Sequence, residues 1–208
     1  SCFKQKTAYE IGVRLVGSEM CIRDRALDKL RHLEPPNQMH VGEVDKKEWG
    51  CKVELNSYRG NETKYLRQIN LNRSISYIYN HKARYCSKTN HEIYSLMKPG
   101  DDGTCKSISH IFPYHNRNNI FKDKYFRLYR DRPCRTITAH MRSDCHSHIH
   151  PTQHRGLTPR EAARVQSFPD DYLFLGPYLM PYKHIGNAVP PLMSRIIAKS
   201  IKKFLIDI

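Results

Sequence analysis

The sequence lacks any hydrophobic run that could cross a membrane and any pair of closely spaced cysteines. A membrane-spanning helix needs about 18 consecutive apolar residues, and no stretch approaches that length. No continuous apolar stretch follows the early lysines, so we expect no secretory signal peptide. The seven cysteines are odd in number and form no CxxC pair. These absences predict free thiols in a reducing, cytoplasmic compartment, and neither a disulfide framework nor a membrane protein.

Acidic residues are also scarce, because 35 lysines and arginines face only 20 aspartates and glutamates, with 12 histidines in addition. The formal net charge is therefore +15 at pH 7. Basic side chains displace the counterions that condense on a phosphate backbone, so this balance favours a nucleic-acid partner. A solvated basic surface, as in ribosomal proteins, is the alternative. The 208 residues suffice for one large domain or for one and a half small ones.

The first 25 residues stand apart from the rest. Residues 15–25 read LVGSEMCIRDR, which matches the translation of one reading frame of a common sequencing adapter. We therefore expect residues 1–25 to be a non-native, adapter-derived segment and exclude them from the fold. An ordinary N-terminal helix is the alternative. Without these residues the net charge falls by 2, from +15 to +13, so the basic balance remains.

From residue 26 to about residue 150 the pattern is irregular, and it contains no internal repeat. Residues 100–120 are rich in glycine, proline and asparagine, which indicates loops. Helical spacing and alternating polarity predict a few elements in the rest. In chain order these are a short helix over Ala26–His32 that ends before Pro35-Pro36, a strand over Ser74–Asn80, a helix over Glu92–Met97 that ends at Pro99-Gly100, and a hairpin of two strands, Arg135–His140 and Ser147–His150.

The signals are sharper beyond residue 150. Thr158 and Glu161 have the spacing of a capping box, in which each side chain bonds to the other residue's backbone N–H, and Pro159 suits the first helical turn. The helix that they open should run until Pro169 stops it. Gly186-Asn187 indicates a turn.

A final amphipathic helix is expected to open at Pro190-Pro191. Apolar side chains recur on one side of it, with lysines opposite. The apolar face comprises Leu192, Ile196, Ile197, Ile201, Phe204 and Leu205, and the basic face comprises Lys199, Lys202 and Lys203.

Two blocks in this part carry a family resemblance. They read RGLTPREAARVQSFPDDY at residues 155–172 and YKHIGNAVPP at residues 182–191, and they resemble the ninth and tenth motifs of the DNA (cytosine-5) methyltransferases. Upstream segments resemble the target-recognition region that precedes these motifs in the family. They are NHKARYCSKTN (80–90), YSLMKPGD (94–101), KYFRLYRDRPCRTITAH (124–140) and HIHP (148–151). The resemblance covers essentially everything from residue 26 onward.

The resemblance implies an α+β fragment of an α/β S-adenosylmethionine-dependent methyltransferase from a bacterium or a phage. Residues 26–150 would form a small, irregular target-recognition domain that binds double-stranded DNA. Residues 151–208 would form the C-terminal part of the methyltransferase domain, with helices that complete a Rossmann-like catalytic domain.

The reaction that the resemblance implies is transfer of a methyl group from S-adenosylmethionine to carbon 5 of a cytosine flipped out of the duplex. In the family, a cysteine thiolate of a Pro-Cys-Gln motif attacks carbon 6, and a glutamate of a Glu-Asn-Val motif supports the ring. Neither motif occurs here, nor does the glycine-rich cofactor motif. The sole Pro-Cys step, Pro133-Cys134, precedes Arg135 inside the target-recognition pattern. We therefore expect no catalytic residue in this chain, no activity from it alone, and an N-terminal catalytic domain supplied in cis or in trans.

The motif matches also imply binding roles for particular residues. The cofactor's methionine end would be lined by Gly186, Asn187 and Ala188. Phosphate beside the flipped nucleotide would be contacted by Thr136 of the Thr136-Ile137 step, or by Thr138. Guanine or phosphate contacts are expected from Arg127, Arg130, Arg132 and Arg135, for which a solvated surface position is the alternative. The two lobes would be held together by Arg155, Arg160, Glu161 and Arg164 through buried Arg–Glu pairing.

The histidine-rich run at residues 145–150 invites a metal interpretation, because His146, His148 and His150 would share one face of the expected strand. A metal site normally needs a second group of ligands. Cys86, Cys105 and His140 lack diagnostic spacing for that role, so we expect no metal.

Three interpretations remain open. The chain is the C-terminal fragment of a cytosine-5 methyltransferase, or a natural non-catalytic DNA-specificity subunit that pairs with a separate catalytic chain, or a stand-alone basic DNA- or RNA-binding protein. The fragment interpretation predicts an exposed apolar face on the last helix, which would lack its packing partner. The third interpretation predicts none.

Overall fold

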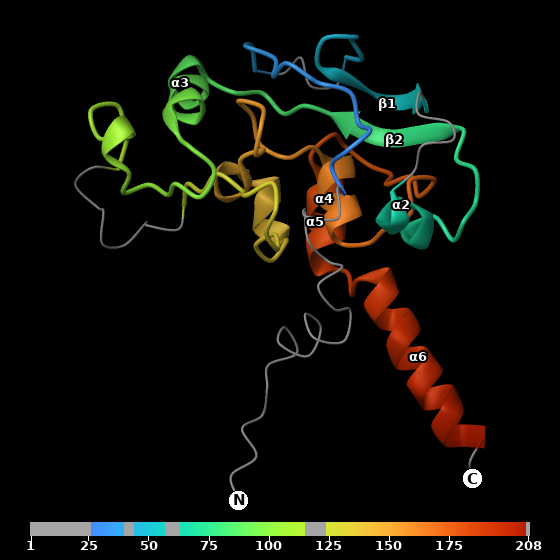
Figure 1. Cartoon of the computed structure of the whole chain (residues 1–208). Coiled ribbons are helices and arrows are strands. Elements are labelled where there is room, and N and C mark those ends of the chain that lie inside the picture. The colour runs from blue at the N-terminus through green and yellow to red at the C-terminus, as the bar shows by residue number, and fades with distance from the viewer. Residues whose placement is uncertain (1–25, 40–43, 57–62, 115–123, 207–208) are drawn as a thin grey trace, which may run out of the picture.

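The computed structural model describes residues 26–39, 44–56, 63–114 and 124–206, without the side chains of Lys203 and Phe204 (Figure 1). The expected adapter-derived segment, residues 1–25, lies outside the described residues. The elements follow in the order β1 (Gly50–Leu55), α2 (Lys64–Ile69), β2 (Tyr77–Lys82), α3 (Lys88–Leu96), the 3-10 turns η4 (Lys106–Ile108), η6 (Ala139–Arg142) and η7 (His146–His148), and the helices α4 (Pro159–Val165), α5 (Met180–Asn187) and α6 (Pro191–Ile206).

Strands β1 and β2 form a two-stranded antiparallel sheet, with Val53 opposite Tyr79. The strand predicted over Ser74–Asn80 is displaced toward the C-terminus, because β2 begins only at Tyr77 and ends at Lys82. No element is predicted over the residues of β1. Residues 51–55 do alternate between apolar and polar side chains, but Val53 and Leu55 are 46% and 69% exposed, so no buried apolar face accompanies the alternation.

The sheet is fastened to the C-terminal half of the chain through Asn80. This residue has φ of 60°, a left-handed conformation that asparagine tolerates better than most side chains. Its amide donates to the carbonyl oxygen of Phe174 at 3.1 Å and accepts from the backbone N–H of the same residue at 3.0 Å. Figure 1 shows the consequence, with β2 lying beside α4.

Among the described residues, the hydrophobic core forms three clusters. The largest surrounds α4 and α5, and includes Ile137, Met141, Leu157, Ala162 and Ile185. The second surrounds α3, and includes Ile93, Tyr94, Ile108, Phe112 and Tyr125. The third joins α2 to the start of α6, and includes Ala26, Leu66, Ile69 and Leu192. The first and third clusters thus include residues that follow residue 150, whereas the second is built from residues before it.

Three of the predicted helices are confirmed. Helix α4 begins after Thr158 with the expected capping box and Pro159 in its first turn. Helix α6 begins at Pro191 as predicted. Helix α3 contains the predicted segment but begins earlier, at Lys88, because the Ser87 hydroxyl accepts from the backbone N–H of Asn90 at 3.2 Å and caps the helix there.

Two other predictions are wrong. The segment Ala26–His32 is a turn and extended chain, because Arg164 donates to the carbonyl oxygens of Ala26 and Asp28 at 3.2 and 2.9 Å. The predicted hairpin is absent as well, since Arg135–His140 and Ser147–His150 contain no strand and lead into η6 and η7. The alternation of exposed and buried residues around Ile137 imitates a strand.

Helix α6 leaves the body of the protein, as Figure 1 shows. Its root is anchored, because the backbone N–H of Leu192 donates to the hydroxyl of Ser167 at 3.1 Å. Further along, the predicted apolar face is open to solvent: Ile201 is 54% exposed and Leu205 is 65% exposed. Within the described ranges, none of the helices has both the length and the apolar character that a membrane crossing requires.

Candidate nucleic-acid interface

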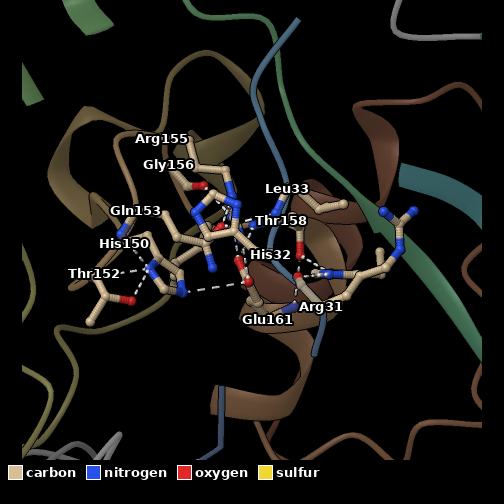
Figure 2. A network of polar contacts seen from close by, with 12 residues as sticks. Arg31, His32, Leu33, His150, Thr152, Gln153, Arg155, Gly156, Thr158 and Glu161 are labelled. Atoms are coloured by element: carbon tan, nitrogen blue, oxygen red, sulfur yellow. Dashed lines mark hydrogen bonds and ion pairs between the residues drawn. The ribbon is translucent and has the colours of Figure 1, made fainter. Parts of the chain in front are cut away.

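A buried carboxylate, Glu161, organises the start of α4 (Figure 2). Arg155 donates two hydrogen bonds to its carboxylate, both at 2.7 Å. The backbone N–H of Thr158 donates to the same group at 2.7 Å, and the Thr158 hydroxyl accepts from the Glu161 N–H at 3.2 Å. Burial by itself would raise the pKa of Glu161, but the charge and hydrogen bonds of Arg155 outweigh it and hold the pKa far below its usual range. Glu161 is therefore a structural anion.

Two neutral imidazoles complete this network. The Nδ1 atom of His150 accepts from the backbone N–H groups of Thr152 and Gln153, at 3.1 and 3.0 Å. Its proton therefore sits on Nε2, which lies 3.7 Å from a Glu161 carboxylate oxygen, as Figure 2 shows. Burial lowers the pKa of His150 to about 3.

His81 brings β2 into the same network. Its Nε2 atom lies 3.1 Å from the carbonyl oxygen of Arg31, which can only accept, so His81 donates there. Its Nδ1 atom then accepts from the Thr158 hydroxyl at 3.1 Å. Burial lowers the pKa of His81 to about 4, which keeps the ring neutral at physiological pH.

The two arginines of α4 itself, Arg160 and Arg164, make different contacts from those of Arg155, which precedes the helix. Arg164 pairs with Asp170 rather than with a glutamate, through hydrogen bonds of 2.7 and 2.9 Å. Arg160 donates to backbone carbonyl oxygens, among them those of Tyr79 at 2.7 Å and Pro169 at 2.8 Å. All three arginines are buried, but Arg160 and Arg164 bind segments distant in sequence, whereas the partners of Arg155 lie within six residues of it. Of the Arg–Glu pairing expected at α4, Arg155–Glu161 is the one that the structure contains.

The segment around Thr136 presents its polar side chains outward. Thr136 and Thr138 are exposed, whereas Ile137 between them is 4% exposed and enters the core. Arg84 holds the residues that follow, because its guanidinium donates to the carbonyl oxygens of Met141, Arg142 and Ser143 at 3.0, 3.0 and 2.5 Å. The sequence gives no direct signal for this role of Arg84, since its partners lie nearly 60 residues away.

Gly186 lies directly against this segment. The expected turn at Gly186-Asn187 is wrong, because both residues belong to the last turn of α5. A Cβ atom on Gly186 would lie 2.1 Å from the backbone nitrogen of Ala139 and 2.2 Å from the carbonyl carbon of Thr138. Glycine is therefore required for the approach of α5 to η6. The next residue, Asn187, is exposed, and Ala188 packs partly on the core.

The four candidate DNA-contacting arginines separate into two kinds. Arg127 is buried, and it donates to the carbonyl oxygens of Tyr94, Met97 and Pro151 at 2.6, 2.8 and 3.2 Å. The expectation that it reaches DNA is wrong, because its donors are used inside the fold. Arg130 and Arg132 are exposed and Arg135 is half-buried.

Aromatic rings lie beneath two of the remaining arginines. The guanidinium carbon of Arg132 lies 4.1 Å from the ring centre of Tyr129, and that of Arg135 lies 4.7 Å from the ring centre of Phe126. These are cation–π contacts, which fix where a guanidinium sits without using its N–H donors. These side chains form a polar and basic surface, and aromatic rings orient two of its arginines. We call it the recognition surface; it comprises Thr136, Thr138, Arg130, Arg132 and Arg135.

The histidines of the 145–150 run do not share a face. The ring of His146 stacks on Tyr125 at 4.5 Å, and its Nδ1 atom lies 2.6 Å from the Tyr94 hydroxyl. His148 and His150 are buried in separate surroundings. Across the described parts of the chain, no three histidine, cysteine or acidic side chains come together as a metal site would need. Burial raises the pKa of Cys134 to about 12, so this thiol is protonated and a poor nucleophile at neutral pH.

Comparison with known proteins gives concordant matches. The family model described as C-5 cytosine-specific DNA methylase matches residues 27–203. The type II methyltransferase M.AgeI of Thalassovita gelatinovora is 50% identical over 82 residues, which are 39% of this chain and 19% of that protein. The type II methyltransferase M.DdeI of Desulfomicrobium norvegicum is 31% identical over 159 residues, which are 68% of this chain and 36% of that protein.

A crystal structure is also similar. It is described as a DNA modification methyltransferase encoded within a prophage in E. coli, and it has a TM-score of 0.59 and 20% sequence identity over 88% of this chain and 47% of that one. At that identity the likeness concerns the fold. The chain thus spans between about a fifth and a half of the proteins that it matches. Since the family model covers most of the sequence, the chain belongs to the C-5 cytosine-specific DNA methylase family.

Proposed function

We propose that this chain is the target-recognition and cofactor-edge part of a cytosine-5 DNA methyltransferase. Residues 26–150 form the target-recognition domain in this proposal, and residues 151–208 the C-terminal part of the methyltransferase domain. The observation that supports it best is the contact between Gly186 and Thr138, because it joins the end of α5 to the segment that carries the exposed threonines. Residues expected on the DNA side and on the cofactor side thus belong to one packed unit.

On the DNA side, Thr136 and Thr138 are free to offer hydroxyl groups to phosphate, and Arg130, Arg132 and Arg135 supply positive charge. The buried groups Arg155, Arg160, Glu161 and Arg164 fix α4 within the fold and would hold the chain against the catalytic lobe. Target recognition here is therefore a property of a preformed surface resting on α4 and α5.

On the cofactor side, the residues fit S-adenosylmethionine in part. Asn187 is exposed at the end of α5, and its amide makes no hydrogen bond within the described residues, so it can bond to a ligand. Ala188 adjoins it. Gly186 serves the packing instead, because the space where its side chain would be is filled by the backbone of Thr138 and Ala139. The bound cofactor would supply the methyl group, and the catalytic cysteine would come from outside this chain.

Reconstitution tests the proposal. The chain would be expressed alone and together with the amino-terminal part of a family member chosen because it contains a Pro-Cys-Gln motif. Incorporation of tritiated methyl groups into duplex DNA would then be measured. We expect incorporation only from the mixture, and none when the cysteine of that motif is replaced by alanine. Incorporation by this chain alone would contradict the proposal. The gene upstream decides whether the two parts are one protein or two.

A further inference from the structure

The ring of Tyr129 packs directly against the backbone of Gly100. Gly100 has φ of +94°, and a Cβ atom there would lie 2.2 Å from the Tyr129 hydroxyl oxygen and 2.3 Å from the ring carbon that bears it. The phenol ring therefore lies against bare backbone. Two hydrogen bonds hold the backbone at this contact. The Gly100 N–H donates to the Arg127 carbonyl oxygen at 2.7 Å, and the Arg127 N–H donates to the Asp101 carbonyl oxygen at 3.0 Å.

Arg132 contacts the same ring. Its guanidinium carbon is 4.1 Å from the Tyr129 ring centre, and its side chain is exposed. Within the described residues, no hydrogen bond or ion pair uses its N–H donors, and the contact with this ring leaves them open to solvent. A guanidinium that lies over a ring can still donate hydrogen bonds to a ligand. Because the ring already orders the side chain before binding, less conformational entropy is lost when the ligand binds.

Neighbouring arginines do not combine these properties. The guanidinium of Arg127 donates hydrogen bonds to three backbone carbonyl oxygens. Arg130 is exposed but has no aromatic ring to orient it within the described chain. Arg135 lies over Phe126 but is half-buried and engaged with its surroundings. Arg132 is thus the arginine of the recognition surface that is both oriented and available.

Resting on the proposed function, we propose that Arg132 reads a guanine in the major groove of the target site, and that Tyr129 and Gly100 are positioning residues for it. Guanine presents two acceptors, O6 and N7, on one rigid edge, and an arginine fork matches them in a bidentate contact. Such a contact needs a defined orientation. A phosphate contact needs only a positive charge within reach, which a mobile arginine or lysine supplies equally well.

Binding selection with the full 208-residue chain tests this proposal. The chain would be incubated with duplex DNA that contains a randomised stretch, and the retained DNA would be sequenced. We expect one position with guanine enriched about tenfold or more over other bases. Arg132→Lys keeps the charge but loses the fork, so it should retain most of the total binding and lose the enrichment at that position.

Two further variants separate orientation from charge. Tyr129→Leu should weaken the enrichment while Arg132 is intact, and Tyr129→Phe, which keeps the ring, should preserve it. Arg130→Gln is the matched control, and it should lower retention of all sequences alike without changing the base profile.

The results separate the guanine contact of Arg132 from DNA binding by the chain as a whole. If the wild-type chain retains duplex DNA and Arg132→Lys has the wild-type base profile, Arg132 is a phosphate contact and the inference is wrong. If the wild-type chain retains no duplex at all, target recognition by this chain is refuted and the inference with it.

Discussion

Gly186 and Thr138 are in backbone contact although 48 residues separate them, so that a Cβ atom on the glycine would lie 2.2 Å from the threonine's carbonyl carbon. One residue on the α5 side, Asn187, and one on the η6 side, Thr138, are exposed next to this contact. The two surfaces therefore cannot move independently without separating α5 from η6.

Replacing Gly186 by alanine should destabilise the chain by about 1–3 kcal/mol, because the added methyl group overlaps backbone atoms that have no rotamer to change. Urea unfolding followed by circular dichroism measures this. Asn187→Ala is the control, since its side chain is exposed, and it should change the free energy of unfolding by no more than about 0.5 kcal/mol. Equal unfolding midpoints for the two variants would contradict the close contact.

Removing one partner of the buried pair Arg155–Glu161 should cost about 3–5 kcal/mol, because the other charge is left without compensation in the interior. We expect Arg155→Met to show this loss. Arg73→Met is the comparison, since Arg73 and Asp171 form an ion pair that is partly exposed and should contribute at most about 1 kcal/mol. A similar effect of both substitutions on the urea midpoint would mean that burial does not strengthen the first pair.

Stability should fall as the pH is lowered from neutrality. The pKa of His81, about 4, and that of His150, about 3, lie below their usual 6.5 because of burial. A depressed folded-state pKa contributes stability that is fully present above pH 6.5 and is lost as the pH falls toward these values. The lowered pKa of Glu161 acts in the same direction below its usual 4.5.

Urea midpoints measured between pH 7.5 and pH 4.5 check this dependence. His150→Gln should flatten it, since a residue that must stay neutral is removed. The exposed His184 offers the control, and His184→Gln should leave the slope unchanged. A midpoint that rises on acidification would show that the imidazoles are charged in the folded state.

The exposed apolar face of α6 should make the isolated chain prone to associate with other copies of itself. Ile201 and Leu205 are 54% and 65% exposed, and such a patch favours contact with other apolar surfaces. Ile201→Lys should lower binding of a hydrophobic dye and the light scattering of concentrated solutions. Lys199→Ala, on the same helix, should not. Because Ile201 packs on little, its substitution should leave the urea midpoint nearly unchanged; a large drop would show that this face is covered.

Features coded by neighbouring residues were predictable from the sequence, and features coded by distant ones were not. Thr158 and Glu161 satisfy each other within one helical turn, so their pattern sufficed for α4. Arg127 has the same composition cues as Arg132, yet it is buried because three carbonyl oxygens from 24 to 33 residues away converge on it.

The same reason explains the predictions that fail for backbone structure. Ile137 between two exposed threonines gives the period of a strand, but the Arg84 guanidinium gathers the carbonyl oxygens that follow into η6. Gly186-Asn187 has the composition of a turn, and the glycine is instead needed for a helix to approach a distant backbone. In each case the deciding partner lies far along the chain, where local patterns carry no information.

Helix α4 has no side that faces solvent, since each of its seven residues is buried. A helix at the surface can unravel one turn at a time, whereas separating α4 from its surroundings breaks the Glu161 and Asp170 ion pairs together with the largest hydrophobic cluster. Its amide hydrogens should therefore exchange with deuterium only when the whole described fold opens. The exchange rates of α4 would then report global stability, and those of the outer turns of α6 would report local fraying.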